Sequence, residues 1–231
     1  MAKYSHVFFD IDRTLWDFDK NTLLTFNDIL HKHELFERGI PSLNSFMEIY
    51  SPINRKLWEL YKAGEIGKPE LNHLRFYSTL LSFGIDDSRC AEQIAMDYID
   101  ISPTKTALIE GALEVLDYLK ERYHLGLITN GFEEIQRYKV VLSGLQSYFK
   151  WVITSEEAGY LKPHAGIFEY ALKKTGAPAS GSLYIGDEPV ADVQGARLAG
   201  MDQVLFNRNG IENDTTATYT ILHLRELTTL L

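Results

Sequence analysis

The chain has 231 residues, enough for one or two domains of ordinary size, which excludes a small scaffold that depends on disulfides or metals. Hydrophobic residues make up 45%, charged residues 24% and aromatic residues 12%, a composition that excludes a disordered chain. Subtracting 32 acidic from 23 basic residues gives a net charge of −9. That sign disfavours polymeric nucleic acid as a partner, and an anionic small substrate would need a local cation.

The N-terminal segment and the cysteine content indicate where the protein works. Residues 1–15 contain one short apolar stretch broken by aspartates, too short and too acidic for a signal peptide or a membrane span. The single cysteine, Cys90, cannot form an internal disulfide and is of a type most often buried as a small hydrophobe. We therefore expect a cytoplasmic protein that does not bind a membrane.

The order of the predicted elements indicates the fold. The apolar run within residues 4–11 predicts a strand buried on both faces, as in a parallel sheet. Residues 17–100 have helical spacing with glycine and proline breaks, which predicts about four helices. Later, predicted helices at 112–122, 133–143, 167–174 and 190–199 alternate with predicted strands at 125–129, 151–154, 183–186 and 203–206.

Alternating helices and strands favour right-handed crossovers and a parallel sheet covered on both faces. The predicted fold class is α/β, with a doubly wound, Rossmann-like core. We expect this core to comprise residues 1–16 and 102–231. Residues 17–101 would form an all-helical cap inserted after the first strand.

Polar side chains follow three of the predicted strands. Asp10 and Asp12 follow the first strand, residues 129–131 (TNG) end the next, and Asp187 with Glu188 follows residues 183–186. In an open α/β sheet, ligands bind beyond the carboxyl ends of the strands, so we expect these residues to share one site. Lys162 lies in the loop after residues 151–154, before a helix expected to start at Pro163.

Carboxylates gathered in this way require a cation. Asp10, Asp12 and Asp187 would repel one another and raise their pKa values unless a positive charge lay among them. Mg²⁺ prefers oxygen ligands and shares phosphate oxygens with a substrate. Thr129 and the Asn130 amide, before a helix expected to begin near residue 132, suit an anionic oxygen.

Each of these residues also has an ordinary structural explanation. Aspartates that close strands are often turn residues or helix caps, and Thr-Asn-Gly is a common turn signal. A lysine before a proline is usually solvated. Their joint occurrence, in chain order and each at a strand end, favours a functional site.

Four motifs in order make the chain resemble the haloacid dehalogenase (HAD) superfamily over nearly its whole length. They are residues 8–15 (FFDIDRTL), 127–131 (LITNG), 162–163 (KP) and 186–192 (GDEPVAD). The helical insertion between the first two is similar to the C1-type cap of that superfamily. The resemblance implies a phosphatase that acts through an aspartyl-phosphate intermediate.

The resemblance also implies roles for single residues. Asp10 would be the nucleophile and Asp12 the general acid and base. Thr129 and the Asn130 amide would hold the phosphoryl oxygens, and Lys162 would neutralise charge on the nucleophile and the phosphoryl group. Mg²⁺ would be bound by the Asp10 carboxylate, the Asp12 backbone carbonyl and Asp187. Behind these ligands, Asp192 would orient a metal-bound water or Lys162, with Glu188 beside it.

Two features of the first motif qualify the resemblance. Family members commonly have glycine at the position of Arg13, so that this backbone position must tolerate a side chain here. Dehalogenases of the superfamily lack an aspartate at the position of Asp12 and need no metal. Asp12 therefore argues for phosphate chemistry rather than cleavage of a carbon–halogen bond.

The substrate class rests on a narrower resemblance. Residues 16–19 (WDFD), 54–61 (NRKLWELY), 64–66 (GEI) and 128–132 (ITNGF) are similar to the house-cleaning pyrimidine 5′-nucleotidases. That similarity implies a small phosphorylated metabolite, a nucleoside 5′-monophosphate, as substrate. Four aromatic residues suit stacking on a base but also suit ordinary packing: Trp16, Phe18, Trp58 and Tyr61. Two polar residues suit either substrate contact or a helix surface: Asn54 and Arg75.

Two alternatives stay open on the sequence. One is a phosphatase or mutase for a sugar phosphate or phosphoglycolate. The other, of a different class, is a phospho-accepting signalling module, because receiver domains also combine strand-end aspartates, a threonine and a lysine around Mg²⁺. Against the second stand the helical insertion and Asp12, which supplies the acid and base that turnover needs.

Overall fold

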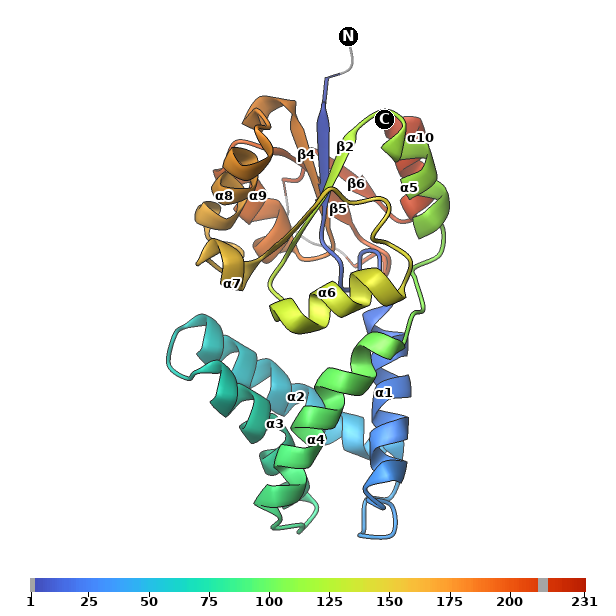
Figure 1. The fold of residues 1–231 in the computed structure, drawn as a ribbon, viewed down its shortest axis with the longest axis vertical. Helices are drawn as coiled ribbons and strands as arrows, with labels where there is room; N and C mark the ends of the chain where they lie inside the picture. The colour runs from blue at the N-terminus through green and yellow to red at the C-terminus, as the bar shows by residue number, and fades with distance from the viewer. Residues whose placement is uncertain (1–2, 212–215) are drawn as a thin grey trace. The chain divides into compact units, whose positions relative to one another are not determined.

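The computed structural model describes residues 3–211 and 216–231. The chain forms two compact units, one of Met1–Asp19 with Thr106–Leu231 and one of Lys20–Lys105. The division expected from the sequence has its boundaries after residues 16 and 101. The first unit contains the sheet and the second contains four helices (Figure 1).

The first unit is built on a six-stranded sheet in which every neighbouring pair is parallel. The strand order β3-β2-β1-β4-β5-β6 places the first strand of the chain in the interior of the sheet. The predicted doubly wound α/β fold is therefore confirmed. The strands are β1 (His6–Phe9), β2 (His124–Thr129), β3 (Trp151–Thr154), β4 (Ser182–Gly186), β5 (Asp202–Phe206) and β6 (Tyr219–Ile221).

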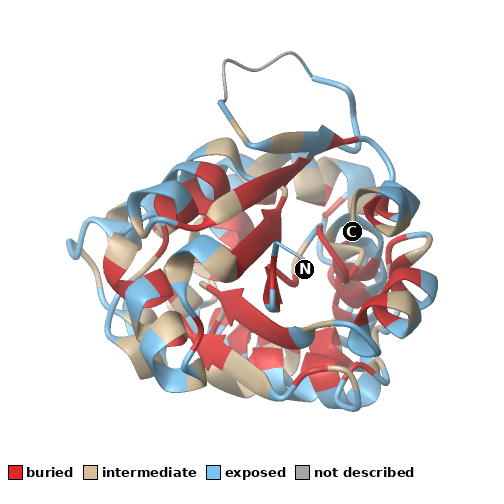
Figure 2. Cartoon of the chain, turned by 90° about the horizontal axis from the view of Figure 1, so that it is seen from above, coloured by how far each residue is buried: buried red, intermediate tan, exposed pale blue. Residues whose placement is uncertain are grey.

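Strand β1 is apolar throughout because both of its faces are covered. Val7 and Phe9 belong to one hydrophobic core and Phe8 to the other. Phe8 pairs in register with Gly126 of β2, where a Cβ atom would lie 2.8 Å from the Phe8 ring. Glycine at that position gives the ring its space. The interior strands β1 and β4 are buried throughout, and most of the sheet is coloured as buried in Figure 2, as expected for a parallel sheet with two covered faces.

Helices cover both faces of the sheet (Figure 1). Helices α5 (Ala112–Lys120), α6 (Glu133–Leu142) and α10 (Leu227–Leu230) contribute to the core that contains Val7 and Phe9. Helices α8 (Ala165–Thr175) and α9 (Gly195–Leu198) contribute to the core that contains Phe8. Both faces of the sheet are therefore packed, and the loops at its carboxyl edge begin at the ends of packed strands.

The second unit contains α1 (Phe18–Lys32, with its first two residues in the first unit), α2 (Leu43–Lys62), α3 (Lys68–Ser82) and α4 (Ser88–Ile101). Its core is aromatic. The ring of Phe26 lies with its centroid 4.5 Å from Tyr50, 5.0 Å from Phe46 and 5.5 Å from Tyr98. Asp87 caps α4 by accepting from the Cys90 amide at 2.9 Å. The helices packed around this aromatic core are the four predicted from the sequence.

Some elements differ from those predicted. Helix α8 does not start at Pro163: His164 caps it by accepting from the Gly166 amide at 3.0 Å, and a short helix α7 (Ser155–Ala158) precedes it. The helix predicted at 190–199 is a π-helical turn (Pro189–Gln194) followed by α9. Strand β6 and helix α10 were not predicted, because three or four residues carry too little periodicity. In the described part of the chain, no helix is long and apolar enough to span a membrane.

Candidate active site

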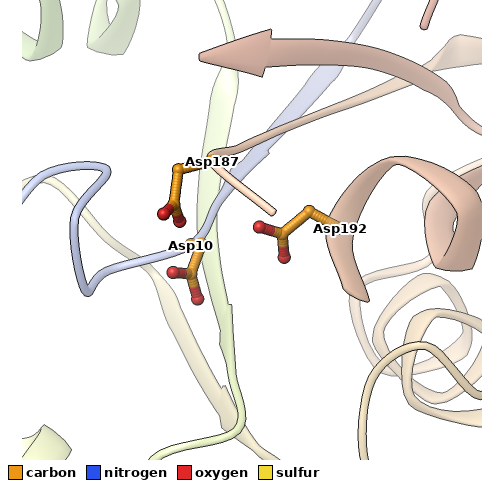
Figure 3. Close-up of side chains that lie close together, drawn as sticks. All are labelled: Asp10, Asp187 and Asp192. Atoms are coloured by element: carbon orange, nitrogen blue, oxygen red, sulfur yellow. The ribbon is translucent and has the colours of Figure 1, made fainter. Parts of the chain in front are cut away.

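Three carboxylates meet at the carboxyl edge of the sheet. Asp10 follows β1, Asp187 follows β4, and Asp192 lies on the π-helical turn. One oxygen of each carboxylate lies within 4.8 Å of the others, and in Figure 3 the three side chains point toward one another. The ends of β1 and β4 therefore converge, with Asp192 rather than the Asp12 side chain as the third carboxylate.

Lys162 ties two of these carboxylates together. Its Nζ atom donates to Asp10 Oδ1 at 2.7 Å and to Asp192 Oδ1 at 2.6 Å. It also donates to the Tyr184 hydroxyl at 2.9 Å, and that hydroxyl lies 3.0 Å from the Ile128 carbonyl oxygen. Lys162 is 3% exposed, so it is a buried cation of the site and not a solvated surface lysine.

Asn130 fixes the loop that carries this lysine. Its Nδ2 atom donates to the Lys162 carbonyl oxygen at 3.0 Å, and its Oδ1 atom accepts from the Lys162 amide at 2.7 Å. Next to it, Thr129 is buried, and its hydroxyl oxygen accepts from the Gly131 amide at 3.1 Å. The side-chain amide of Asn130 is thus engaged with the backbone of the lysine loop.

Glycine at position 186 allows Asp192 to approach the sheet. A Cβ atom on Gly186 would lie 2.3 Å from Asp192 Cγ, which is closer than real atoms come. Asp192 is buried, and its Oδ2 atom accepts from the Glu188 amide at 2.9 Å. The Glu188 side chain itself is exposed. Asp192 is therefore held by the backbone amide of Glu188, and the Glu188 side chain takes no part in this contact.

The surroundings of Asp10 and Asp187 favour the protonated form of both carboxyl groups. Burial raises the pKa of Asp10 to about 7, helped by Asp192 and Asp12 and opposed by Lys162. Burial, with Asp10, Asp192 and Glu188 nearby, raises the pKa of Asp187 to about 8. Burial alone would lower the pKa of Lys162, but Asp10 and Asp192 raise it well above its ordinary value. Lys162 is therefore charged, whereas Asp10 and Asp187 resist ionisation.

The donor set fits a divalent cation. Three carboxylates lie together, and the ammonium group among them, on Lys162, is bonded to Asp10 and Asp192, while the Arg13 guanidinium only partly offsets the charge at Asp187. The available ligand atoms are oxygens, which Mg²⁺ prefers, and the raised pKa values of Asp10 and Asp187 show where positive charge is missing. The residues present thus fit the predicted Mg²⁺.

Asp12 lies near Asp10, but its carboxylate has partners on helix α6. Its Oδ1 atom accepts from Lys139 Nζ at 2.6 Å, and its Oδ2 atom accepts from Gln136 Nε2 at 2.7 Å. Neither partner was predicted from the sequence. A signal was present, because Gln136 and Lys139 fall within the stripe of α6 formed by the buried residues Ile135 and Val140, where polar residues need a reason.

Arg13 has a backbone conformation that favours glycine. Its backbone φ is 63°, in the left-handed region that favours glycine. The Arg13 side chain is exposed; its Nε atom donates to Asp19 Oδ1 at 3.0 Å, and its guanidinium lies 4.4 Å from the centroid of the Phe18 ring. The chain thus turns after Asp12 as a glycine would allow, but at a conformational cost.

The residues considered for substrate contact have different surroundings. Arg75 is 3% exposed, and its guanidinium lies 4.7 Å from the ring centroids of Phe76 and Tyr98, so a helix-surface role is wrong. Asn54 is half-buried. Trp16 is fully buried in the first unit beside Phe18, whereas Trp58 and Tyr61 are half-buried on α2 with their ring centroids 5.6 Å apart.

A doubly wound α/β sheet that gathers acidic side chains and a buried lysine at its carboxyl edge has its polar site where proteins of this class bind their ligands. The family model for haloacid dehalogenase-like hydrolases matches residues 7–206. The chain belongs to this family, as its four motifs indicated.

Several relatives match over most of their length. The chain is 33% identical to the pyrimidine 5′-nucleotidase PynA of Streptococcus pneumoniae (97% of this chain, 93% of the relative). It is 30% identical to the pyrimidine 5′-nucleotidase YjjG of Escherichia coli (99% and 98%). It is also 30% identical to a glyceraldehyde 3-phosphate phosphatase of Methanothermobacter thermautotrophicus (87% and 84%).

Among solved structures, the chain is similar to the HAD-hydrolase YfnB of Bacillus subtilis, which was crystallised bound to magnesium. The TM-score is 0.88 at 28% identity, covering 100% of this chain and 99% of that one.

Proposed function

We propose that the protein is a Mg²⁺-dependent phosphomonoester hydrolase that acts through an aspartyl-phosphate on Asp10. The observation that carries the proposal is Lys162, which places one buried ammonium against Asp10 and Asp192 at 2.7 and 2.6 Å. A carboxylate held against a cation, at an edge of the sheet where oxygen ligands converge, suits attack on a phosphoryl group, because both partners of that attack are anionic.

The first half of the reaction transfers the phosphoryl group to the protein. An Asp10 oxygen attacks phosphorus while the bond from phosphorus to the leaving oxygen breaks, and Asp12 donates a proton to that oxygen. Lys162 balances charge on Asp10 and on the phosphoryl oxygens. Thr129 and Asn130 hold those oxygens beside the N-terminus of α6.

The second half restores the enzyme. Asp12, now ionised, takes a proton from a water molecule that attacks phosphorus, and the bond from phosphorus to Asp10 breaks. Phosphate leaves, and Asp10 is a carboxylate again. The same residue thus serves as acid and then as base, which is the step that a signalling module would lack.

Asp10, Asp187 and the Asp12 backbone carbonyl would hold the metal, with Asp192 and Glu188 behind them. When bound, Mg²⁺ supplies positive charge that lets the carboxylates ionise and lets an anionic substrate enter. Asp192 keeps Lys162 in place, because it accepts from Nζ on one oxygen and from the Glu188 amide on the other.

For the substrate we propose a small phosphorylated metabolite, a nucleoside 5′-monophosphate with a pyrimidine base. Two of the relatives are named pyrimidine 5′-nucleotidases and match 93% and 98% of their own lengths. The glyceraldehyde 3-phosphate phosphatase, at similar identity, keeps a sugar phosphate as the second candidate. The helical unit, residues 20–105, would act as a cap that manages water around the acyl phosphate.

The test is a phosphatase assay with matched variants. Asp10→Asn removes the nucleophile, so we expect the loss of hydrolysis of an aryl phosphate and of every natural substrate. Asp117→Asn is the control, because Asp117 is an exposed aspartate of the first unit that pairs with Lys120. Omission of Mg²⁺ should also abolish activity. Turnover by Asp10→Asn would disprove the mechanism.

A substrate panel in the same assay tests the substrate class. We expect higher kcat/KM for pyrimidine nucleoside monophosphates than for glyceraldehyde 3-phosphate or phosphoglycolate. The reverse order would leave the mechanism intact and replace the substrate.

A further inference from the structure

Helix α6 holds the proposed acid and base at both of its oxygens. Lys139 Nζ lies 2.6 Å from Asp12 Oδ1, and Gln136 Nε2 lies 2.7 Å from Asp12 Oδ2. Both donors are buried, Gln136 at 2% and Lys139 at 3% exposure, whereas the Asp12 side chain is 22% exposed. Two buried donors therefore hydrogen-bond to one partly accessible carboxylate.

The surroundings of each donor fix its position. Lys139 Nζ lies 3.9 Å from the centroid of the Trp16 ring, and Trp16 is fully buried. Gln136 packs against Gly131 so closely that a Cβ atom there would lie 1.8 Å from its Nε2 atom. Both donors are therefore packed against neighbouring groups of the first unit.

We propose that Lys139 and Gln136 are positioning residues that aim Asp12 at the leaving oxygen and at the attacking water, an inference that rests on the proposed function. A carboxylate has about four lone-pair sites, of which the two donors occupy two. The other two sites stay free to carry and deliver a proton. Fixing the carboxylate plane matters because proton transfer requires the donor within hydrogen-bond reach of the acceptor.

Leaving-group dependence separates this role from a purely structural one. An aryl phosphate with a good leaving group needs little protonation, whereas an alkyl phosphate such as a nucleoside monophosphate needs it fully. Lys139→Met keeps the side chain's length and removes the donor. We expect kcat/KM for the alkyl phosphate to fall about 10- to 100-fold, part of the roughly 10²- to 10⁴-fold that acid and base catalysis provides. For the aryl phosphate we expect kcat/KM to fall less than about threefold, since protonation of the leaving oxygen contributes little to its hydrolysis.

Two further variants complete the experiment. Gln136→Met removes the other donor at nearly constant volume and should show the same selective loss, which keeps the test informative if Lys139→Met does not fold. Arg137→Met is the control, because Arg137 is an exposed cation of the same helix whose partner is Glu133. It should change neither activity.

The outcomes are distinct. Equal losses on the alkyl and aryl substrates, or no loss on either, would overturn the positioning role while the phosphatase function stands. A wild-type enzyme that hydrolyses neither substrate would instead overturn the proposed function on which the inference rests.

Discussion

At the scale of single residues, Arg13 shows how a site can keep an unfavourable conformation. The turn after Asp12 requires φ of 63°, which costs a residue with a Cβ atom about 1 to 2 kcal/mol. The exposed pair with Asp19 returns about 0 to 1 kcal/mol. The chain keeps arginine although its side chain does not offset the full cost through that pair.

Comparing two substitutions isolates the backbone contribution. Arg13→Gly and Arg13→Ala both remove the contacts of the guanidinium with Asp19 and Phe18, but only alanine keeps a Cβ atom in the left-handed region. We expect Arg13→Gly to be more stable than Arg13→Ala by about 1 kcal/mol, after the greater chain entropy of unfolded glycine is subtracted. Urea unfolding of both variants measures the difference. Equal stabilities would show that the turn relaxes around the side chain.

Lys162 and Lys139 differ in how far their roles could be predicted from the sequence. Both are buried lysines of the first unit, and each ends at a carboxylate of the site, Asp10 or Asp12. The loop position of Lys162 beyond a strand made it predictable. Lys139 lies inside a helix, 127 positions from its partner in the chain, so only the packing of α6 on the sheet brings the two together.

At the scale of elements, the ends of β1 and β4 and the π-helical turn concentrate charge at one point. Because the pKa values of Asp10 and Asp187 are raised to about 7 and about 8, the folded protein holds protons that the unfolded chain releases near pH 4. This contribution to stability is fully present below the unfolded pKa. It is lost as the pH rises through about 7 to 8.

Thermal unfolding with and without Mg²⁺ tests this linkage. Without a divalent cation, we expect Tm to fall as the pH rises from about 5 and to level off above about 8, where Asp10 and Asp187 are ionised in the folded protein as well. Mg²⁺ competes with those protons, so it should raise Tm more at about pH 8.5 than at about pH 6. In Asp187→Asn the gain from Mg²⁺ should shrink. A gain that is equal at both pH values would contradict the placement of the cation at these carboxylates.

The predicted elements were most reliable where an apolar run has clear polar boundaries. Strand β3 was predicted at its observed bounds because an apolar run bounded by polar residues defines it. The π-helical turn at 189–194 was predicted as part of one helix, because helical periodicity does not distinguish the two hydrogen-bond patterns. This turn brings Asp192 onto Lys162, a contact that the family resemblance implied as one of two roles for Asp192 and that the periodicity of the residues did not indicate.

At the scale of the whole molecule, the net charge of −9 and a preference for a phosphorylated substrate are compatible. The carboxylates of the site account for part of that charge, and a bound Mg²⁺ with Lys162 would make the site locally attractive to a phosphate group. Polymeric anions would still meet the acidic surface. The chain divides into a unit that contains the sheet and its acidic cluster and a unit of helices.

The central claim is that Asp10 carries the phosphoryl group, and rapid-quench kinetics with Asp12→Asn tests it most directly. This variant lacks the base for the second half-reaction but still accepts a phosphoryl group from an aryl phosphate. We predict a burst of aryl alcohol stoichiometric with enzyme, followed by a stall, and a phosphorylated Asp10 peptide in the acid-quenched protein. Steady turnover without a burst, or phosphate found on another residue, would contradict the account.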